Sequence, residues 1–175
     1  PAGGGMYKVA NYLIRAQAQD ASPAAASLEP LDTRGPGSAL ASFAMLGRAI
    51  GKLVRGRFSG ELAGVHVNMA YRLSVFRKGS IVIASRALGI PVVIHLHAQM
   101  DGFYHALPSP LRALVRWTFS HASGVVVIGS EARRFVTEEL KVPASRVDIV
   151  LNGVPGPAIA PARPAERFFQ RVLFV

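Results

Sequence analysis

The sequence predicts an α/β fold built on a doubly wound parallel sheet, and three observations lead to it. Segments with apolar residues at helical spacing alternate with short apolar runs of the kind that form buried strands. Three strand–helix–strand units follow one another, and such crossovers build parallel sheets. Half of the 175 residues are hydrophobic, and this length suffices for one α/β domain with a sizeable core but not for two full domains.

Two amphipathic helices are expected near the N-terminus. Residues 6–18 and 41–55 both place apolar side chains on one helical face, and Gly56 is the expected end of the second helix. The segment 21–38 is rich in Ala, Pro, Ser and Gly, so we expect a loop with room for one short strand. Residues 3–5 are three glycines. Since a glycine-rich turn that opens a helix normally follows a strand, the first strand of the sheet is expected to be missing from this chain.

The rest of the predicted domain alternates strand and helix. Ser109 followed by Pro110 is expected to cap one helix, and Ser130 is expected to cap the next. The expected strands cover residues 65–69, 91–96, 124–128 and 147–151, and the expected helices cover residues 74–88, 109–121 and 130–140, with Gly89 ending the first of these helices.

The C-terminal residues suggest a boundary between domains. A Pro-rich stretch of the kind found in linkers follows the last strand, and a short apolar run follows the linker. We therefore expect a domain over 1–152, an interdomain linker over 153–170, and the first strand of a truncated second domain over 171–175.

The charge is concentrated in one part of the chain. The net charge is +10, and residues 41–80 hold seven basic residues and one acidic residue. This indicates a local anionic partner, which could be anionic lipid, a phosphorylated acceptor or nucleic acid. On the helix expected at 41–55, Arg48, Lys52 and Arg55 lie opposite the apolar stripe, which suits either a solvated face or a peripheral membrane contact.

Several functional classes are disfavoured by composition. The chain has no Cys, which excludes disulfides, Cys-ligated zinc and a thiol nucleophile. No apolar run approaches the roughly 20 residues of a membrane span, and no signal peptide is recognisable. We therefore expect a cytoplasmic protein that is soluble or peripheral on the inner face of the plasma membrane.

Ligands of open α/β sheets bind outside the carboxyl ends of the strands. Five small or polar features are expected to meet at this edge. A glycine turn before a helix suits a phosphate, because the free N–H groups and the dipole of the helix attract anions. The features are Gly3 to Gly5, Asn68, His97, Ser130 and Asn152.

Two histidines of one strand are assigned different roles. His95 and His97 lie on the same face, and His97 lies at the strand end. We interpret His95 as a structural histidine with satisfied hydrogen bonds and His97 as a ligand contact. A metal pair is conceivable, but no third ligand has a fitting spacing. Asp101 and His105, in the loop that follows, are either polar contacts or solvated.

Three basic residues near the start of the next predicted helix are candidates for binding an acceptor, together with Asn68 and Asp101. Arg72, Arg77 and Lys78 lie close to the expected ligand edge, where they could meet a phosphate of the acceptor. No G-x-S-x-G motif surrounds Ser130, and no pair of carboxylates lies on this edge, so hydrolase chemistry is disfavoured.

Taken together, these segments resemble the N-terminal domain of the group 1, or family 4, glycosyltransferases, which have two Rossmann-like domains (the GT-B fold). The Ser-x-x-Arg-Lys and His-x-His pieces are similar to those of members that build exopolysaccharide or capsule. The resemblance covers nearly the whole chain and rests on residues Gly3–Gly5, Ser74–Lys78, Pro91–His97, Ala122–Ser130 and Ile149–Pro155.

The resemblance implies retaining transfer from a nucleotide-diphosphate sugar to a lipid-linked or glycan acceptor, generally without a metal or other cofactor. It implies that Gly3, Gly4 and Gly5 lie near the donor diphosphate, that His97 lies near the transferred sugar, and that Ser130 faces the cleft between the domains. The family's paired glutamates and diphosphate-binding basic residues belong to the second domain. The resemblance therefore implies that this chain alone is inactive.

Two other functional classes remain open. A non-enzymatic flavodoxin-like ligand-binding module would explain the sheet and the glycine loop, but not the Asn152–Val154 segment followed by a Pro-rich linker. A nucleic-acid-binding domain would explain the basic charge, yet no aromatic residues interleave the bases of the 41–57 segment in the manner of a stacking surface. The glycosyltransferase interpretation, with no nucleic-acid partner, is therefore preferred.

Overall fold

The computed structural model describes residues 5–18, 27–33 and 39–151, and the site predictions at Gly3, Gly4 and Asn152 lie outside these residues. The predicted linker over 153–170 and the strand over 171–175 lie outside them as well. The helices are α1 (Gly5–Ala18), α2 (Ala39–Ser59), α3 (Leu73–Ala87), α4 (Asp101–His105), α5 (Ser109–Ser120) and α6 (Ser130–Glu138), and the strands are β1 (Val65–Met69), β2 (Val92–Leu96), β3 (Gly124–Val127) and β4 (Val147–Ile149).

The four strands form one all-parallel sheet in the order β1-β2-β3-β4. Helix α3 connects β1 to β2, α4 and α5 connect β2 to β3, and α6 connects β3 to β4. The predicted series of three crossovers is thereby confirmed, and the fold is α/β with helices flanking a parallel sheet. All four carboxyl ends consequently meet at one edge.

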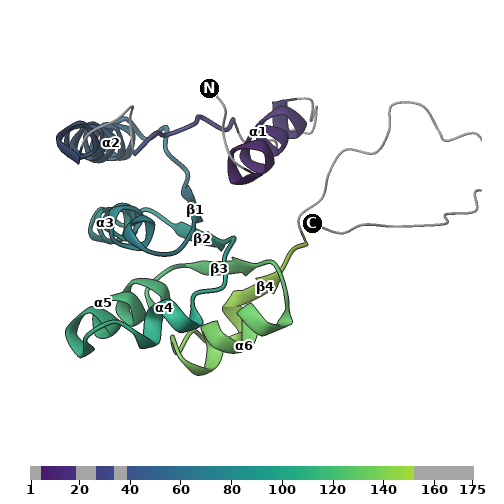
Figure 1. Ribbon diagram of the computed structural model, residues 1–175. Helices are drawn as coiled ribbons and strands as arrows, with labels where there is room; N and C mark the ends of the chain where they lie inside the picture. Colours follow the sequence, from purple (N-terminus) through teal and green to yellow (C-terminus); the bar gives the residue numbers. More distant parts are fainter. Residues whose placement is uncertain (1–4, 19–26, 34–38, 152–175) are drawn as a thin grey trace, which may run out of the picture.

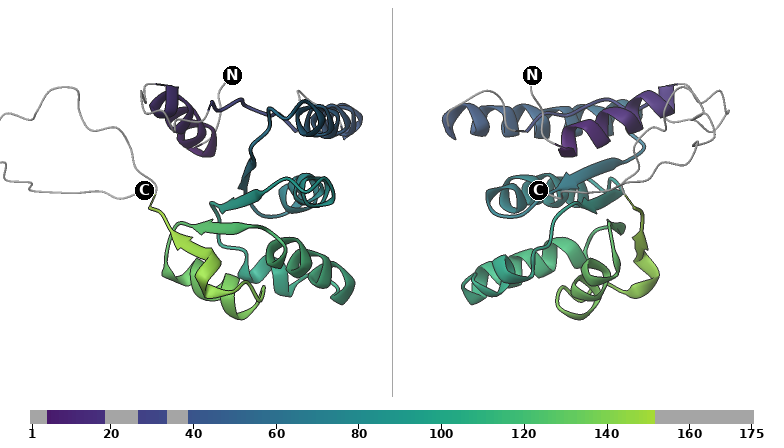
Figure 2. Two further views of the ribbon diagram at one scale, coloured as in Figure 1. Left: turned by 180° about the vertical axis from the view of Figure 1, so that it is seen from behind. Right: turned by 45° about the vertical axis from the view of Figure 1, so that its right-hand side comes forward.

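Helices lie on both sides of this sheet. Figures 1 and 2 place α2 and α3 on one side and α1 on the other. Helix α3 packs against α2, α5 and the first two strands, and α6 packs against β3 and β4. None of the described helices is both long and apolar enough to cross a bilayer.

The strands separate an apolar face from a polar one. Val67, Ile94 and Val127 belong to the buried core, together with apolar residues of α3 and α5. Burying each such side chain contributes about 1.5–3 kcal/mol. Because successive residues of a strand point to opposite faces, Asn68 and His95 lie on the other face of the sheet. The polar residues of that face are therefore carried by a rigid, well-packed support.

Helix α2 is longer than its sequence pattern indicates. Gly56 does not end the helix, which continues to Ser59, and Gly60 follows with a φ of 76°. The predicted stop was wrong because a helical glycine costs only about 1 kcal/mol relative to alanine, which packing against α3 outweighs. Gly89, by contrast, has a φ of 69° just beyond α3, as the predicted helix end requires.

The predicted N-caps of α5 and α6 were wrong. Pro108 holds the N-cap position of α5, so Ser109 is the first helical residue. Gly129 holds the equivalent position in α6, so Ser130 lies within the first turn. Neither N-cap makes a side-chain hydrogen bond, and extended backbone at Pro108 and Gly129 begins these helices instead.

Candidate functional site

The carboxyl edge of the sheet holds three of the residues that the sequence assigned to it. Asn68 lies near the end of β1, His97 follows β2, and Ser130 begins α6 just beyond β3. Gly5 is the first residue of α1. Ser130 is exposed and forms no side-chain hydrogen bond within the described part of the chain, so only Asn68 and His97 are joined here.

Asn68 and His97 are held together at the ends of two neighbouring strands. The Nε2 atom of His97 lies 2.9 Å from Oδ1 of Asn68. The backbone N–H of His97 donates to the carbonyl of Met69 at 2.9 Å, and Nζ of Lys78 donates to the carbonyl of Asn68. Sequence reasoning assigned Asn68 to acceptor binding and missed its contact with His97, which depends on the strand register.

His95 is buried beside His97 without the hydrogen bonds expected of it. Its side chain is 4% exposed, and neither ring nitrogen has a hydrogen-bond partner among the described residues. The interpretation of His95 as a satisfied histidine was therefore wrong. Burial, followed by the nearby His97 and His66 rings, lowers the pKa of His95 to about 4. His95 is consequently neutral at physiological pH.

Ring packing links three histidines on the polar face. The His95 and His97 rings stack with centroids 3.9 Å apart, and the His66 ring meets His95 edge-on at 5.4 Å. Burial lowers the pKa of His66, and a hydrogen bond with Asn68 partly offsets this effect. In the described residues, no three metal-ligating side chains are grouped so that they could hold an ion. The cluster is therefore organised by ring contacts and hydrogen bonds.

The start of α3 brings basic side chains to the same edge. Arg72, the N-cap residue, has a φ of 62° and a ψ of −139°, a conformation costly for any residue but glycine. Its guanidinium lies 5.3 Å from the centroid of the Tyr71 ring. Arg77 is half-buried, and its Nε has no hydrogen-bond partner in the described part of the chain. Backbone strain of this kind clusters at functional sites.

Lys78 is less available than the sequence suggested. Its ammonium is engaged with the carbonyl of Asn68. Burial lowers the pKa of Lys78, Arg77 lowers it further, and Asp32 acts in the opposite direction. Lys78 therefore stabilises the backbone beside His97, whereas Arg72 and Arg77 remain better placed to meet an anion.

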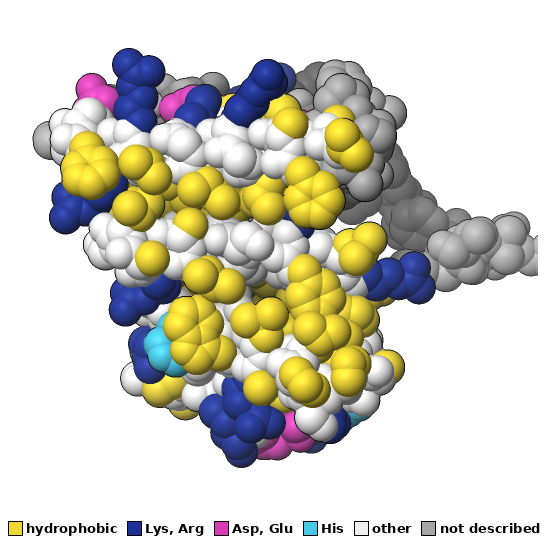
Figure 3. All heavy atoms as spheres, turned by 90° about the vertical axis from the view of Figure 1, so that its left-hand side faces the viewer, with side chains coloured by type: hydrophobic (Ala, Val, Ile, Leu, Met, Phe, Trp, Pro, Cys, Tyr) yellow, Lys and Arg dark blue, Asp and Glu magenta, His cyan; other side chains and the backbone are white. Residues whose placement is uncertain are grey.

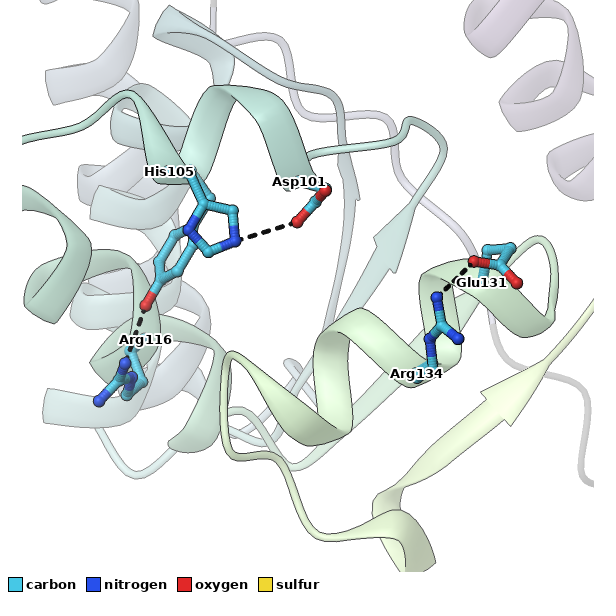
Figure 4. Close-up of polar contacts among 6 residues, drawn as sticks. Asp101, His105, Arg116, Glu131 and Arg134 are labelled. Atoms are coloured by element: carbon cyan, nitrogen blue, oxygen red, sulfur yellow. Dashed lines mark hydrogen bonds and ion pairs between the residues drawn. The ribbon is translucent and has the colours of Figure 1, made fainter.

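Asp101 lies in a helix that the sequence pattern did not reveal. The predicted loop contains the short helix α4, in which Asp101 contacts His105 at 3.1 Å (Figure 4). Tyr104, which precedes His105 in the chain, is buried, and its hydroxyl accepts a hydrogen bond from Arg116 at 3.1 Å. A surface hollow of about 350 Å³ lies beside these residues and is lined by α4, α5 and Glu139. Asp101 is thus paired within its own helix.

A comparison with protein families decides the family of the chain. Residues 8–153 match the model described as "Glycosyl transferase 4-like domain". The chain belongs to the glycosyl transferase 4-like family. A comparison with curated proteins gave no match.

The glycosyl transferase 4-like match covers the whole described sheet and the carboxyl edge, including Asn68, His97 and Ser130. It supports a glycosyltransferase-type function with a sugar donor and an acceptor as partners. It also supports the predicted resemblance to the N-terminal domain of a GT-B enzyme. The matched residues include Asn152 but begin after Gly3–Gly5.

Proposed function

We propose that this glycosyl transferase 4-like domain is the acceptor-side half of a retaining glycosyltransferase in polysaccharide biosynthesis. The enzyme would transfer a sugar, of the hexosyl class, from a nucleotide-diphosphate donor to a lipid-linked or glycan acceptor without a metal. The observation that carries the proposal is the family match combined with His97, which Asn68 holds at the carboxyl edge. A linker over 153–170 and a donor-binding domain from 171 onward would complete the enzyme.

The donor would lie across the same edge. In this proposal Gly3 to Gly5 and the N-terminus of α1 stabilise charge on the leaving diphosphate, because free N–H groups and the helix dipole favour anions. Ser130 and Asn152 contribute further polar contacts. His97 orients a hydroxyl of the transferred sugar by a hydrogen bond rather than acting as a nucleophile.

The acceptor would approach through the start of α3. Of the residues assigned to it, Arg72 and Arg77 form no ion pair among the described residues, while Lys78 is engaged by Asn68 and Asp101 by His105. A guanidinium forms two parallel hydrogen bonds with a phosphate, which suits a phosphorylated acceptor.

Replacing Arg72 with Gln in the full-length enzyme is expected to raise the KM for the acceptor by about 10- to 100-fold, since a charge-assisted hydrogen bond contributes roughly 1.5–3 kcal/mol. The KM for the nucleotide sugar should change little, because the donor contacts other residues. Initial rates measured at varied acceptor and saturating donor provide the test.

Arg86 provides the matched control for this experiment. It is exposed in the last turn of the same helix, so Arg86→Gln should leave both KM values unchanged. An Arg72→Gln enzyme with a normal KM for the acceptor would refute the assignment of this edge to the acceptor.

We also propose that the domain docks on the inner face of the plasma membrane. Arg48, Lys52 and Arg55 are all exposed on α2, and only Lys52 among them forms an ion pair within the described residues, with Glu29. The same helix exposes Phe43 (74%) and Phe58 (81%). Figure 3 shows hydrophobic side chains gathered over α2, α3 and α5, with basic side chains along α2. Apolar and basic residues side by side suit an anionic bilayer surface.

Changing Arg48, Lys52 and Arg55 together to Gln should weaken binding to anionic vesicles on the order of a hundredfold, since each base near such a surface contributes about 1 kcal/mol. Vesicle sedimentation at constant ionic strength measures this effect. Binding to zwitterionic vesicles should change little, because the lost attraction is electrostatic.

A second triple variant controls for the loss of positive charge alone. Arg133, Arg134 and Lys141 are exposed on and after α6, away from α2, and their change to Gln should leave vesicle binding nearly intact. If both triple variants weaken vesicle binding equally, or if neither weakens it, the basic side chains of α2 form a solvated face and not a membrane contact.

A further inference from the structure

We propose that Asn68 and His95 are positioning residues for His97: Asn68 fixes the tautomer of the His97 ring, and His95 fixes the plane of that ring. The function of His97 toward a sugar rests on the function proposed above. The tautomer and the ring geometry, however, are properties of this chain and can be tested without any substrate.

The tautomer follows from the chemistry of the contact between Asn68 and His97. A neutral imidazole has one N–H donor and one acceptor nitrogen, and the amide oxygen of Asn68 can only accept. Because Nε2 of His97 lies 2.9 Å from that oxygen, Nε2 carries the proton. The other nitrogen, Nδ1, is therefore the acceptor atom of the ring.

The position of Asn68 is itself fixed from three directions. Its strand pairs with β2 so that Asn68 lies beside His95, and Lys78 donates to its backbone carbonyl. The neighbouring carbonyl, of Met69, accepts the backbone N–H of His97. These contacts fix the backbone of Asn68, and with it the point from which its side chain reaches the His97 ring.

His95 supplies the second constraint. Its ring stacks on that of His97 at 3.9 Å with an interplanar angle of 29°, and the His66 ring meets that of His95 edge-on at 5.4 Å. His95 cannot hold His97 by a hydrogen bond, since its nitrogens have no such contact among the described residues. Its effect on His97 is therefore one of packing, which an aromatic ring without nitrogen atoms can reproduce.

The tautomer can be measured by long-range proton–nitrogen NMR on the ¹⁵N-labelled 175-residue chain near pH 7.5. The wild-type spectrum is expected to show His97 protonated on Nε2, with that proton protected from solvent exchange. In Asn68→Ala the exchange should accelerate by about tenfold, because the hydrogen bond is lost. In Asn68→Asp the pKa of His97 should rise by about one unit or more, because a carboxylate favours the imidazolium.

The stacking is tested by rescue. His95→Phe should preserve the His97 signals, whereas His95→Ala should broaden them and accelerate exchange. Gln99→Ala is the matched control, since Gln99 is an exposed amide in the same loop. The proposal is overturned if wild-type His97 carries its proton on Nδ1, or if Asn68→Ala and Asn68→Asp both leave the His97 signals unchanged.

Kinetics of the full-length enzyme separate this proposal from the proposed function. If Asn68→Ala accelerates proton exchange at His97 in the chain and also lowers kcat, with the KM values nearly unchanged, both hold. If the exchange accelerates as expected but turnover is normal, the positioning within the chain stands, and the role of His97 in sugar transfer is wrong.

Discussion

Replacing His97 with Ala in the full-length enzyme is expected to lower kcat/KM by about 30- to 1,000-fold. The loss corresponds to roughly 2–4 kcal/mol, the cost of one hydrogen bond that strengthens in the transition state. Little change in Tm is expected, because His97 lies at the strand end and is only half-buried. Initial rates with a nucleotide sugar and acceptor, together with a thermal melt, test both parts.

Two outcomes would contradict this assignment. A His97→Ala enzyme with near-normal turnover would remove His97 from the site, and a variant that unfolds would reduce its role to a structural one. Replacement of His105 by Ala provides the control, because His105 is exposed and its ion pair with Asp101 is a surface contact of small energy.

The stability of the chain is expected to fall steeply between pH 6.5 and 4 because of His95. The folded state lowers the pKa of His95 to about 4, while the unfolded chain retains the ordinary value of 6.5. The unfolded state therefore binds the proton more tightly in this window, and protonation favours unfolding. The contribution of neutral, buried His95 to the free energy of unfolding is fully present above pH 6.5. It decreases as the pH falls, by about 3 kcal/mol in all.

Urea unfolding of the wild type and of His95→Leu at pH 7.5 and 4.5 measures this contribution. The decrease between the two pH values should be smaller in the variant by about 2–3 kcal/mol. His95→Ala should also lose the pH dependence, but with a lower Tm at pH 7.5, because it leaves a cavity where the buried ring had packed against His97. The same decrease in wild type and His95→Leu would mean that His95 is not the buried, neutral group described above.

The sequence predicted most of this fold because periodicity and packing agree. The run from Val65 to Met69 forms β1 with the predicted bounds, and Gly89 follows α3 as expected. Helix α4 escaped notice because five residues are too few to show a helical period. Ser109 and Ser130 were misassigned as caps, because the extended residue just before each of them holds the N-cap position instead.

The candidate site was only partly predictable. That His97 lies at a strand end follows from alternation and from the position of ligand edges in α/β folds. Its contact with Asn68 does not, because the two are 29 residues apart and meet only through the parallel register of β1 and β2. The stack of His95 on His97 and the strain at Arg72 likewise depend on packing and backbone geometry that no local pattern encodes.

The central claim, that this chain is one half of a glycosyltransferase, is tested most directly by release of nucleoside diphosphate from a panel of nucleotide sugars. The full-length enzyme, supplied with acceptor, and the purified 175-residue chain are compared at equal concentration. We expect turnover by the full-length enzyme and none by the chain alone, because in the proposed enzyme a donor-binding domain would supply the remaining diphosphate contacts. Turnover by the chain above that of a mock preparation, or none by a folded full-length protein with any donor, would contradict the account.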